Sequence, residues 1–99
     1  MNTYELVLLQ RTGKPVAEDD AAYAAVHQRH LDHLEAQRRS GQLRMYGGVT
    51  DAEGTTPTSV YLFRTGSLGA ARAAAEADPL VAAGYLSISV HEFVSGWRG

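Results

Sequence analysis

Three histidines of one predicted helix are the residues best suited to chemistry in this chain. His27, His30 and His33 follow one another at intervals of three. At about 100° per residue, a helix places His30 on one stripe with the apolar residues Tyr23 and Leu34. A buried imidazole must satisfy one donor and one acceptor, and a charged one needs an opposite charge. We therefore predict an inward His30 that has a specific partner.

Asp78 is the best candidate for that partner. Pro79 follows it and disfavours the α region at Asp78, so the preceding helix ends there. A carboxylate beside an imidazole fixes its tautomer, raises its basicity and leaves the far nitrogen free for proton transfer. No serine or cysteine is presented as a nucleophile. Proton transfer by the catalytic pair His30 and Asp78 is therefore the predicted chemistry.

Each of these residues also has a structural interpretation. His30 could be a core histidine that is satisfied by a backbone carbonyl or a water, and Asp78 an N-cap of the short turn that follows. The H-x-x-H-x-x-H spacing fans three ligands across about 120° of helix surface, too wide for one metal ion. His27 and His33 are instead expected to flank the stripe. Nucleotide, dinucleotide and dithiol motifs are lacking, so we expect neither metal nor cofactor.

Composition limits the class of protein. A chain of 99 residues, 44% of them hydrophobic, predicts one domain spanning residues 1–99. The net charge of −2 and the isoelectric point near 6.0 argue against a nucleic-acid surface. The chain lacks cysteine, so disulfides are excluded. Without a signal-like N-terminus or an apolar run of about 20 residues, we expect a cytoplasmic protein outside the membrane.

Hydrophobic periodicity predicts elements in the order β, α, β, β, α, β. The predicted strands are 4–9, 43–49, 59–65 and 85–94, and the predicted helices run from Asp19 and Asp20 to Arg39 and from Ser67 to Ala77. Two connecting segments are predicted as a loop at 10–16 and a turn at 51–57. In the loop, Arg11 is interpreted as a solvated charge in preference to a residue that overhangs a pocket mouth. Gly47 and Gly48 are compatible with close approach of a ligand but favour a bulge or tight packing.

This order predicts an α+β fold, a ferredoxin-like βαββαβ arrangement with an antiparallel sheet. Strands one and three are then central, and both helices cover one face. Apolar residues on the other face need a second cover, so we predict a homodimer that packs sheet against sheet. Trp97, close to the end of the chain, is expected to pack on this domain or on a partner subunit.

The chain resembles the YciI-like, or YCII-related, proteins. The matching features are the strand 4–9, the His30-Leu31-Asp32-His33-Leu34 block, Gly41-Gln42-Leu43, Gly47 with Asp51, and the segment 78–84. The resemblance implies a dimeric α+β barrel with a catalytic dyad at His30 and Asp78, and lyase-like elimination from small cyclic or hydroxylated aromatic compounds. Gly47-Gly48-Val49 departs from the Gly-Pro-Leu common in the family, which loosens the backbone there.

Two functional hypotheses follow. The first is a cofactor-independent acid/base enzyme that carries out elimination or isomerisation on a small molecule with His30 and Asp78. The second is a non-catalytic module for small-ligand binding, dimerisation or regulation, in which the same residues are a buried structural pair. A monooxygenase-like barrel is a third option that no residue favours.

Overall fold

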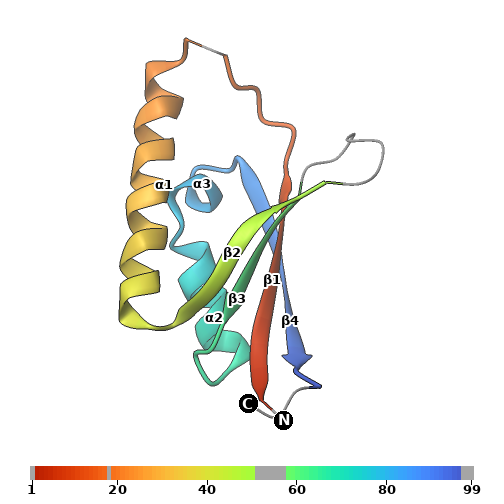
Figure 1. Ribbon diagram of the computed structural model, residues 1–99. Coiled ribbons are helices and arrows are strands. Elements are labelled where there is room, and N and C mark those ends of the chain that lie inside the picture. The colour runs from red at the N-terminus through yellow and green to blue at the C-terminus, as the bar shows by residue number, and fades with distance from the viewer. Residues whose placement is uncertain (1, 18, 51–57, 97–99) are drawn as a thin grey trace.

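A four-stranded antiparallel sheet organises the fold, seen here in a computed structural model that describes residues 2–17, 19–50 and 58–96. The elements are β1 (Thr3–Arg11), α1 (Ala21–Ser40), β2 (Leu43–Val49), β3 (Thr58–Phe63), α2 (Leu68–Glu76), α3 (Pro79–Ala82) and β4 (Leu86–Val94). The strand order is β2-β3-β1-β4 (Figure 1). This order has strands one and three at the centre and confirms the predicted ferredoxin-like fold.

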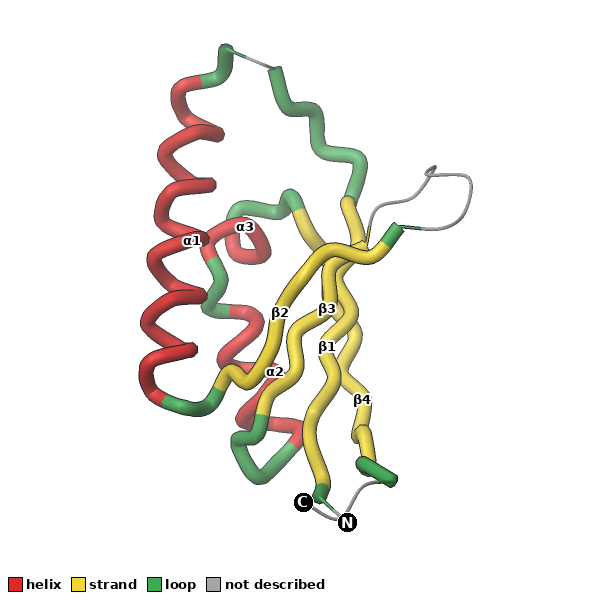
Figure 2. The backbone as a smooth tube through the Cα atoms, in the orientation of Figure 1, coloured by secondary structure: helices red, strands yellow, loops and turns green. Residues whose placement is uncertain are grey.

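The helices lie together on one face of the sheet, as the backbone path shows (Figure 2). Because side chains alternate along a strand, Val7 and Leu9 of β1 point to that face, as do Tyr61 and Phe63 of β3. The buried cluster between the two layers consists of Val7, Leu9, Leu34, Leu43, Tyr61, Phe63, Ala71 and Ala75. The alanines of α2 bring that helix close to the sheet, as its slim composition predicts.

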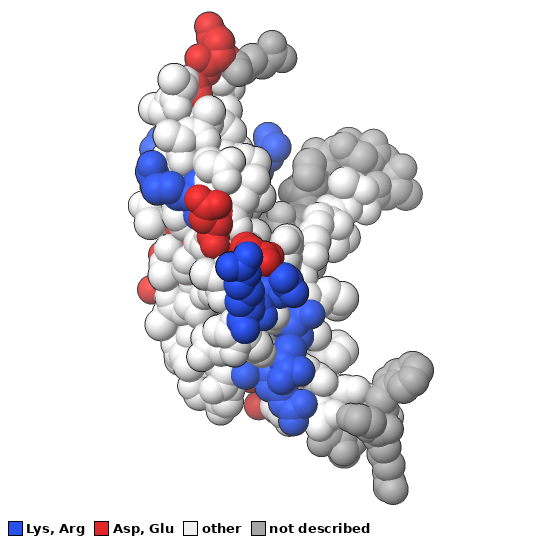
Figure 3. Space-filling view, turned by 60° about the vertical axis from the view of Figure 1, so that its left-hand side comes forward, with Lys and Arg blue, Asp and Glu red and all other residues white. Residues whose placement is uncertain are grey.

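Helix α1 has both of its predicted end signals. Asp20 caps the N-terminus, and Gly41 adopts the left-handed conformation, with φ of 84°, just after the last turn. A cluster of basic side chains lies on the face that carries α1 (Figure 3). At the end of the helix, Arg38 and Arg39 contact Glu35 at 2.7 and 3.3 Å. The hydrogen bond from Arg38 is the main cause that holds the pKa of Glu35 at about 2.

The opposite face of the sheet carries apolar side chains that no helix of the described chain covers. Leu6 and Leu8 of β1 lie there beside Leu62 of β3 and remain partly exposed. Met45 of β2 is 62% exposed, and Phe93 of β4 is 44% exposed. The prediction of strands with two apolar faces is therefore confirmed for β1 and β3.

Strand β1 is longer than predicted. Gln10 pairs with Thr58, and Arg11 pairs with Leu86, so the segment predicted to open a loop continues the sheet. Arg11 is consequently the last residue of a strand and not a loop residue. Neighbouring strands on both sides supply the hydrogen bonds that sequence periodicity alone did not indicate.

Two further predictions about the strands were wrong. The residues Gly47 and Gly48 pair regularly with β3, and the irregularity of β2 lies between Leu43 and Met45. Strand β3 ends at Phe63, before Thr65, because the Thr65 amide turns to donate to the Glu5 carboxylate at 2.8 Å. The predicted turn 51–57 and Trp97 lie outside the described residues.

Candidate active site

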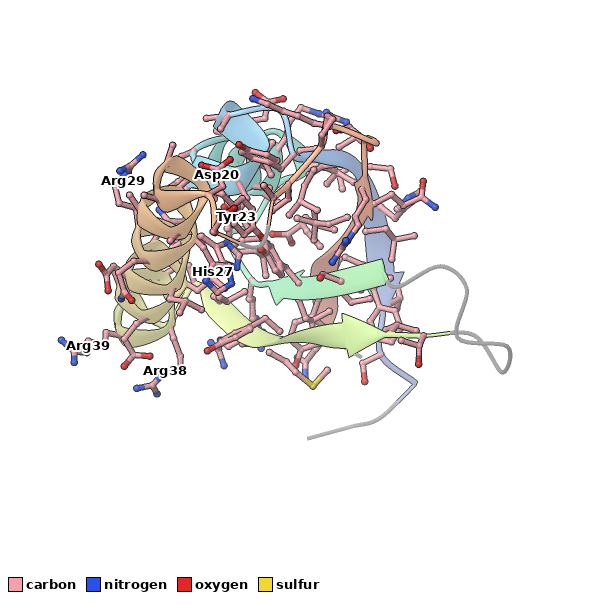
Figure 4. The ribbon with its side chains drawn as sticks, turned by 90° about the horizontal axis from the view of Figure 1, so that it is seen from above. Asp20, Tyr23, His27, Arg29, Arg38 and Arg39 are labelled. Atoms are coloured by element: carbon pink, nitrogen blue, oxygen red, sulfur yellow. The ribbon has the colours of Figure 1, made fainter. Side chains whose placement is uncertain are left out.

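Helix α1 directs His30 into the protein. The Asp20 side chain accepts hydrogen bonds from the Ala22 and Tyr23 amides at 2.9 and 3.1 Å and thereby fixes where the helix begins. From that start, Tyr23 and His27 point toward the sheet, whereas Arg29 points away (Figure 4). His30 follows one turn later on the inward side, and its side chain is 12% exposed. The predicted inward stripe is therefore present.

Asp78 lies at the junction of α2 and α3 and is completely buried. Its backbone is extended, with φ of −60° and ψ of 126°, as expected before proline. One carboxylate oxygen accepts the Leu80 amide at 2.9 Å, which caps α3. The N-cap interpretation of Asp78 is thus correct, but it accounts for only part of its contacts.

The structure brings His30 and Asp78 together across 48 positions of sequence. His30 Nδ1 lies 2.9 Å from Asp78 Oδ1 and 2.8 Å from Oδ2. An ionised carboxylate only accepts hydrogen bonds, so Nδ1 carries the hydrogen. When the ring is neutral, Nε2 then holds the lone pair. The contact that was predicted between the two helices is present; the catalytic role of the pair stays a prediction.

Tyr61 is a third member of this cluster that the sequence analysis did not find. Its hydroxyl donates to Asp78 Oδ2 at 2.7 Å from the buried face of β3. Burial raises the pKa of Tyr61, and the charge of Asp78 raises it further, so this hydroxyl remains a donor. A buried tyrosine on a central strand normally has a polar partner. That rule is the signal that could have pointed to it.

The charge of Asp78 is maintained despite its burial. Burial by itself pushes the pKa of a carboxyl group up. For Asp78 the hydrogen bonds from His30, Tyr61 and the Leu80 amide outweigh this effect, and the pKa falls below the ordinary value of 3.8. The site therefore presents an ionised carboxylate behind the imidazole, which is the arrangement that supports general acid and base chemistry.

Two adjoining cavities lie in front of His30. The inner cavity, of about 190 Å³, is lined by Leu9, Arg11, Tyr23, His27, His30, Ser59, Leu80 and Leu86. The outer cavity, of about 440 Å³, is lined by Arg11, Gly13, Lys14, Val16, Tyr23, Leu80, Tyr85 and Leu86. Four residues line both of them, so the two cavities form one cleft. The Nδ1 atom of His30 is hydrogen-bonded to Asp78. Its Nε2 atom is therefore the nitrogen available to a molecule in the inner cavity.

Of the other histidines of α1, His27 shares the inner cavity with His30, whereas His33 contacts α2. His27 lines the inner cavity, and its ring centre lies 5.7 Å from that of His30. His33 Nε2 lies 3.3 Å from the Ala74 carbonyl of α2. Among residues 2–17, 19–50 and 58–96, no group of three or more His, Cys, Asp or Glu side chains could hold a metal ion. Within the same ranges, no helix is both long and apolar enough to span a bilayer.

A ferredoxin-like domain with a buried carboxylate–imidazole pair at the base of a cleft defines the class of this protein. The YCII-related domain matches residues 6–94. The chain is also 37% identical over 93 residues to the uncharacterised protein YjpA of Bacillus subtilis (strain 168), across 94% of this chain and 95% of that protein. The chain belongs to the YCII-related family.

One solved structure shows the same fold, and a second is less similar. The 5-chloro-2-hydroxyhydroquinone dehydrochlorinase TftG of Burkholderia phenoliruptrix AC1100, in complex with 2,5-dihydroxybenzoquinone, superposes with a TM-score of 0.60 at 21% identity, covering 92% of this chain and 95% of that one. Rv0793 from Mycobacterium tuberculosis has a TM-score of 0.48 at 13% identity and covers 98% of both chains. The likeness to the first of these supports the ferredoxin-like fold.

The two buried histidine contacts predict opposite tautomers. His30 donates through Nδ1 to a carboxylate, whereas His33 donates through Nε2 to a carbonyl. When both imidazoles are neutral, two-bond ¹⁵N–¹H correlation spectra should show the Nδ1–H form for His30 and the Nε2–H form for His33. In Asp78→Ala the preference of His30 should disappear while that of His33 remains. An Nε2–H form at His30 in the unmodified protein would contradict the pairing.

Removing the Tyr61 hydroxyl should lower stability and make it less sensitive to acid. The depressed pKa of Asp78 contributes stability that is present above the ordinary value of 3.8 and is lost as the pH falls through the folded-state pKa. Tyr61→Phe leaves that pKa less depressed. In urea unfolding at about pH 7 it should cost about 1.5–3 kcal/mol, the usual contribution of a hydrogen bond to a charged group. This loss of stability should be smaller at about pH 3, below the ordinary pKa of 3.8, because the ionised carboxylate contributes less to stability there.

Tyr46→Phe provides the matched control for this measurement, because Tyr46 pairs with Tyr61 across the strands but is 44% exposed. It should change the free energy of unfolding by less than about 0.5 kcal/mol at either pH. A deficit in Tyr61→Phe that is equal at both pH values would show that the hydroxyl does not act through the Asp78 charge.

Proposed function

We propose that this chain is a cofactor-independent acid/base enzyme that catalyses a lyase-like elimination or an isomerisation on a small cyclic, hydroxylated compound. His30 acts as general base or acid through Nε2, and Asp78 orients it. The observation that carries the proposal is the contact of His30 Nδ1 with the fully buried Asp78 carboxylate at the base of a cleft. Tyr61 is a positioning residue, since it contacts Asp78 and not the cleft.

The proposed elimination requires the protein to supply proton transfer and no other catalytic group. His30 Nε2 takes a proton from a ring hydroxyl or carbon of the substrate. The electron pair released from that bond forms a new double bond, and the leaving group departs with the electrons of its own bond to carbon. The proton on His30 then passes to water. The substrate loses H⁺ and an anion, so the reaction needs no oxidant or reductant. A dehydrochlorinase with the same fold supports this choice of chemistry.

The size of the inner cavity supports a substrate with a single ring. An engineered apolar cavity of about 150 Å³ binds benzene, and the inner cavity measures about 190 Å³. A substituted six-membered ring therefore fits beside His30, with its substituents reaching into the outer cavity. Tyr23, Leu80 and Leu86 supply apolar contacts along this path.

Replacing His30 should abolish turnover without unfolding the protein. With 5-chloro-2-hydroxyhydroquinone and a panel of halogenated hydroxyaromatic compounds as probes, chloride release should fall by about 10²- to 10⁴-fold in His30→Gln, the usual contribution of a general acid or base. His33→Gln, a histidine outside the cleft, should retain full activity. Chloride release by His30→Gln at the rate of the unmodified protein would refute the role of His30.

The probes, together with further variants of His30 and Asp78, test the alternative of a non-catalytic module. The capping contact between Asp78 and the Leu80 amide favours this alternative, because it gives the pair a structural task. If the task is only structural, the probes should show no turnover, and His30→Ala should lower stability by about 1–3 kcal/mol because it leaves a buried carboxylate without a donor. A volume-matched apolar replacement of both residues should then restore stability. Thermal melts of the single and double variants decide the matter.

We further propose that two copies of the chain pack sheet against sheet. The apolar face formed by Leu6, Leu8, Leu62 and Met45 supports this arrangement. Leu62→Glu should produce a monomer in sedimentation velocity at micromolar concentration, because the acidic side chain would be buried without a partner. Leu31→Glu places the same change on α1 at a residue 43% exposed and should leave the dimer intact. A monomeric unmodified protein would exclude the arrangement.

A further inference from the structure

Arg11 lies where the two cavities meet. As the last residue of β1 it lines both the inner and the outer cavity, and Lys14 lines the outer one. The sequence analysis interpreted Arg11 as a solvated loop charge. Its position on the sheet gives it a fixed backbone beside the path that leads to His30.

The cleft is positively charged. Among the described residues, no aspartate or glutamate lines either cavity. Lys14 Nζ donates to the Ala83 carbonyl at 2.6 Å and lies 4.4 Å from the centre of the Tyr85 ring. Both partners are neutral, so they hold the ammonium group in place without cancelling its charge.

Three arginines of the chain have an acidic partner, which Arg11 lacks among the described residues. Arg38 and Arg39 both contact Glu35, and Arg72 contacts Glu76 at 3.5 Å. Within the described part of the chain, Arg11 forms no ion pair of this kind. A guanidinium group is always charged and presents a planar set of donors that matches a carboxylate or a similar anion. Its free charge at the meeting point of the cavities is therefore available to a ligand.

We propose that Arg11, supported by the charge of Lys14, binds an anionic substituent of the substrate, a carboxylate or an ionised ring hydroxyl. The ring that carries this substituent enters the inner cavity and lies against His30. This inference rests on the proposed function and adds the class of substrate to it. Arg11 determines specificity by its contact with the anion, and His30 performs the proton transfer.

Ligand titrations followed by NMR test this assignment without any turnover. The probes are benzoate, its neutral analogue benzamide, and 2,5-dihydroxybenzoquinone, whose ionised hydroxyls distinguish ring hydroxyls from a carboxylate as the favoured group. At least one anion should bind about tenfold or more tightly than benzamide, as a charge-assisted hydrogen bond provides. Its binding should shift the side-chain signals of Arg11 and His30.

Arg11→Gln should remove the preference for the anion and leave the affinity for benzamide unchanged. The matched control is Arg29→Gln, an equal change on an exposed residue that points away from the sheet (Figure 4). It should keep the preference intact. An anion preference that survives in Arg11→Gln would overturn the assignment. Equal affinity of the unmodified protein for anions and benzamide, or no anion-induced shift at about 10 mM, would overturn it as well.

These outcomes are separable from a failure of the proposed function. If chloride release is unaffected in His30→Gln while Arg11→Gln loses the anion preference, the cleft binds anions but His30 does not carry the chemistry. If turnover depends on His30 while the anion preference persists in Arg11→Gln, the acid/base proposal holds and the assignment of Arg11 is wrong.

Discussion

The buried carboxylate of Asp78 is the constraint on which the rest of this structure depends. An isolated charge in a protein interior is strongly unfavourable unless it is hydrogen-bonded. Asp78 receives hydrogen bonds from His30 of α1, Tyr61 of β3 and the Leu80 amide of α3. Each donor comes from a different element, so the helix layer and the sheet must both be in place before the charge is compensated. The site and the fold are stabilised by the same contacts.

The structural and chemical interpretations of His30 and Asp78 are consequently compatible. Asp78 caps α3 through Oδ1 and still has capacity to accept from His30 and Tyr61. The three donors keep the pKa of Asp78 below the ordinary value. The ionised carboxylate in turn keeps the imidazole in one tautomer and one orientation. Preorganisation of this kind is what general acid and base catalysis requires.

The sequence contains enough information for the fold and for half of the candidate site. Helical periodicity places His30 inward, and Pro79 fixes the backbone of Asp78, so both could be found from local rules. Local rules could identify neither the partner of Tyr61 nor the position of Arg11. Strand alternation shows that Tyr61 faces the helices, but its partner depends on how α2 ends above β3. The position of Arg11 depends on the pairing of β1 with β3 and β4, in which Arg11 pairs with Leu86 and its neighbour Gln10 pairs with Thr58. This pairing is a non-local property.

The distribution of charge explains why the cleft needs its cations. With a neutral imidazole, the pair of His30 and Asp78 carries a net charge of about −1, and an anionic ligand placed beside it would be repelled. Arg11 lines both cavities in front of that buried charge, and Lys14 lines the outer one. Their combined charge offsets the repulsion. In the proposed reaction this charge would also favour the ionised form of a ring hydroxyl, so the cations of the cleft and His30 would promote the same loss of a proton.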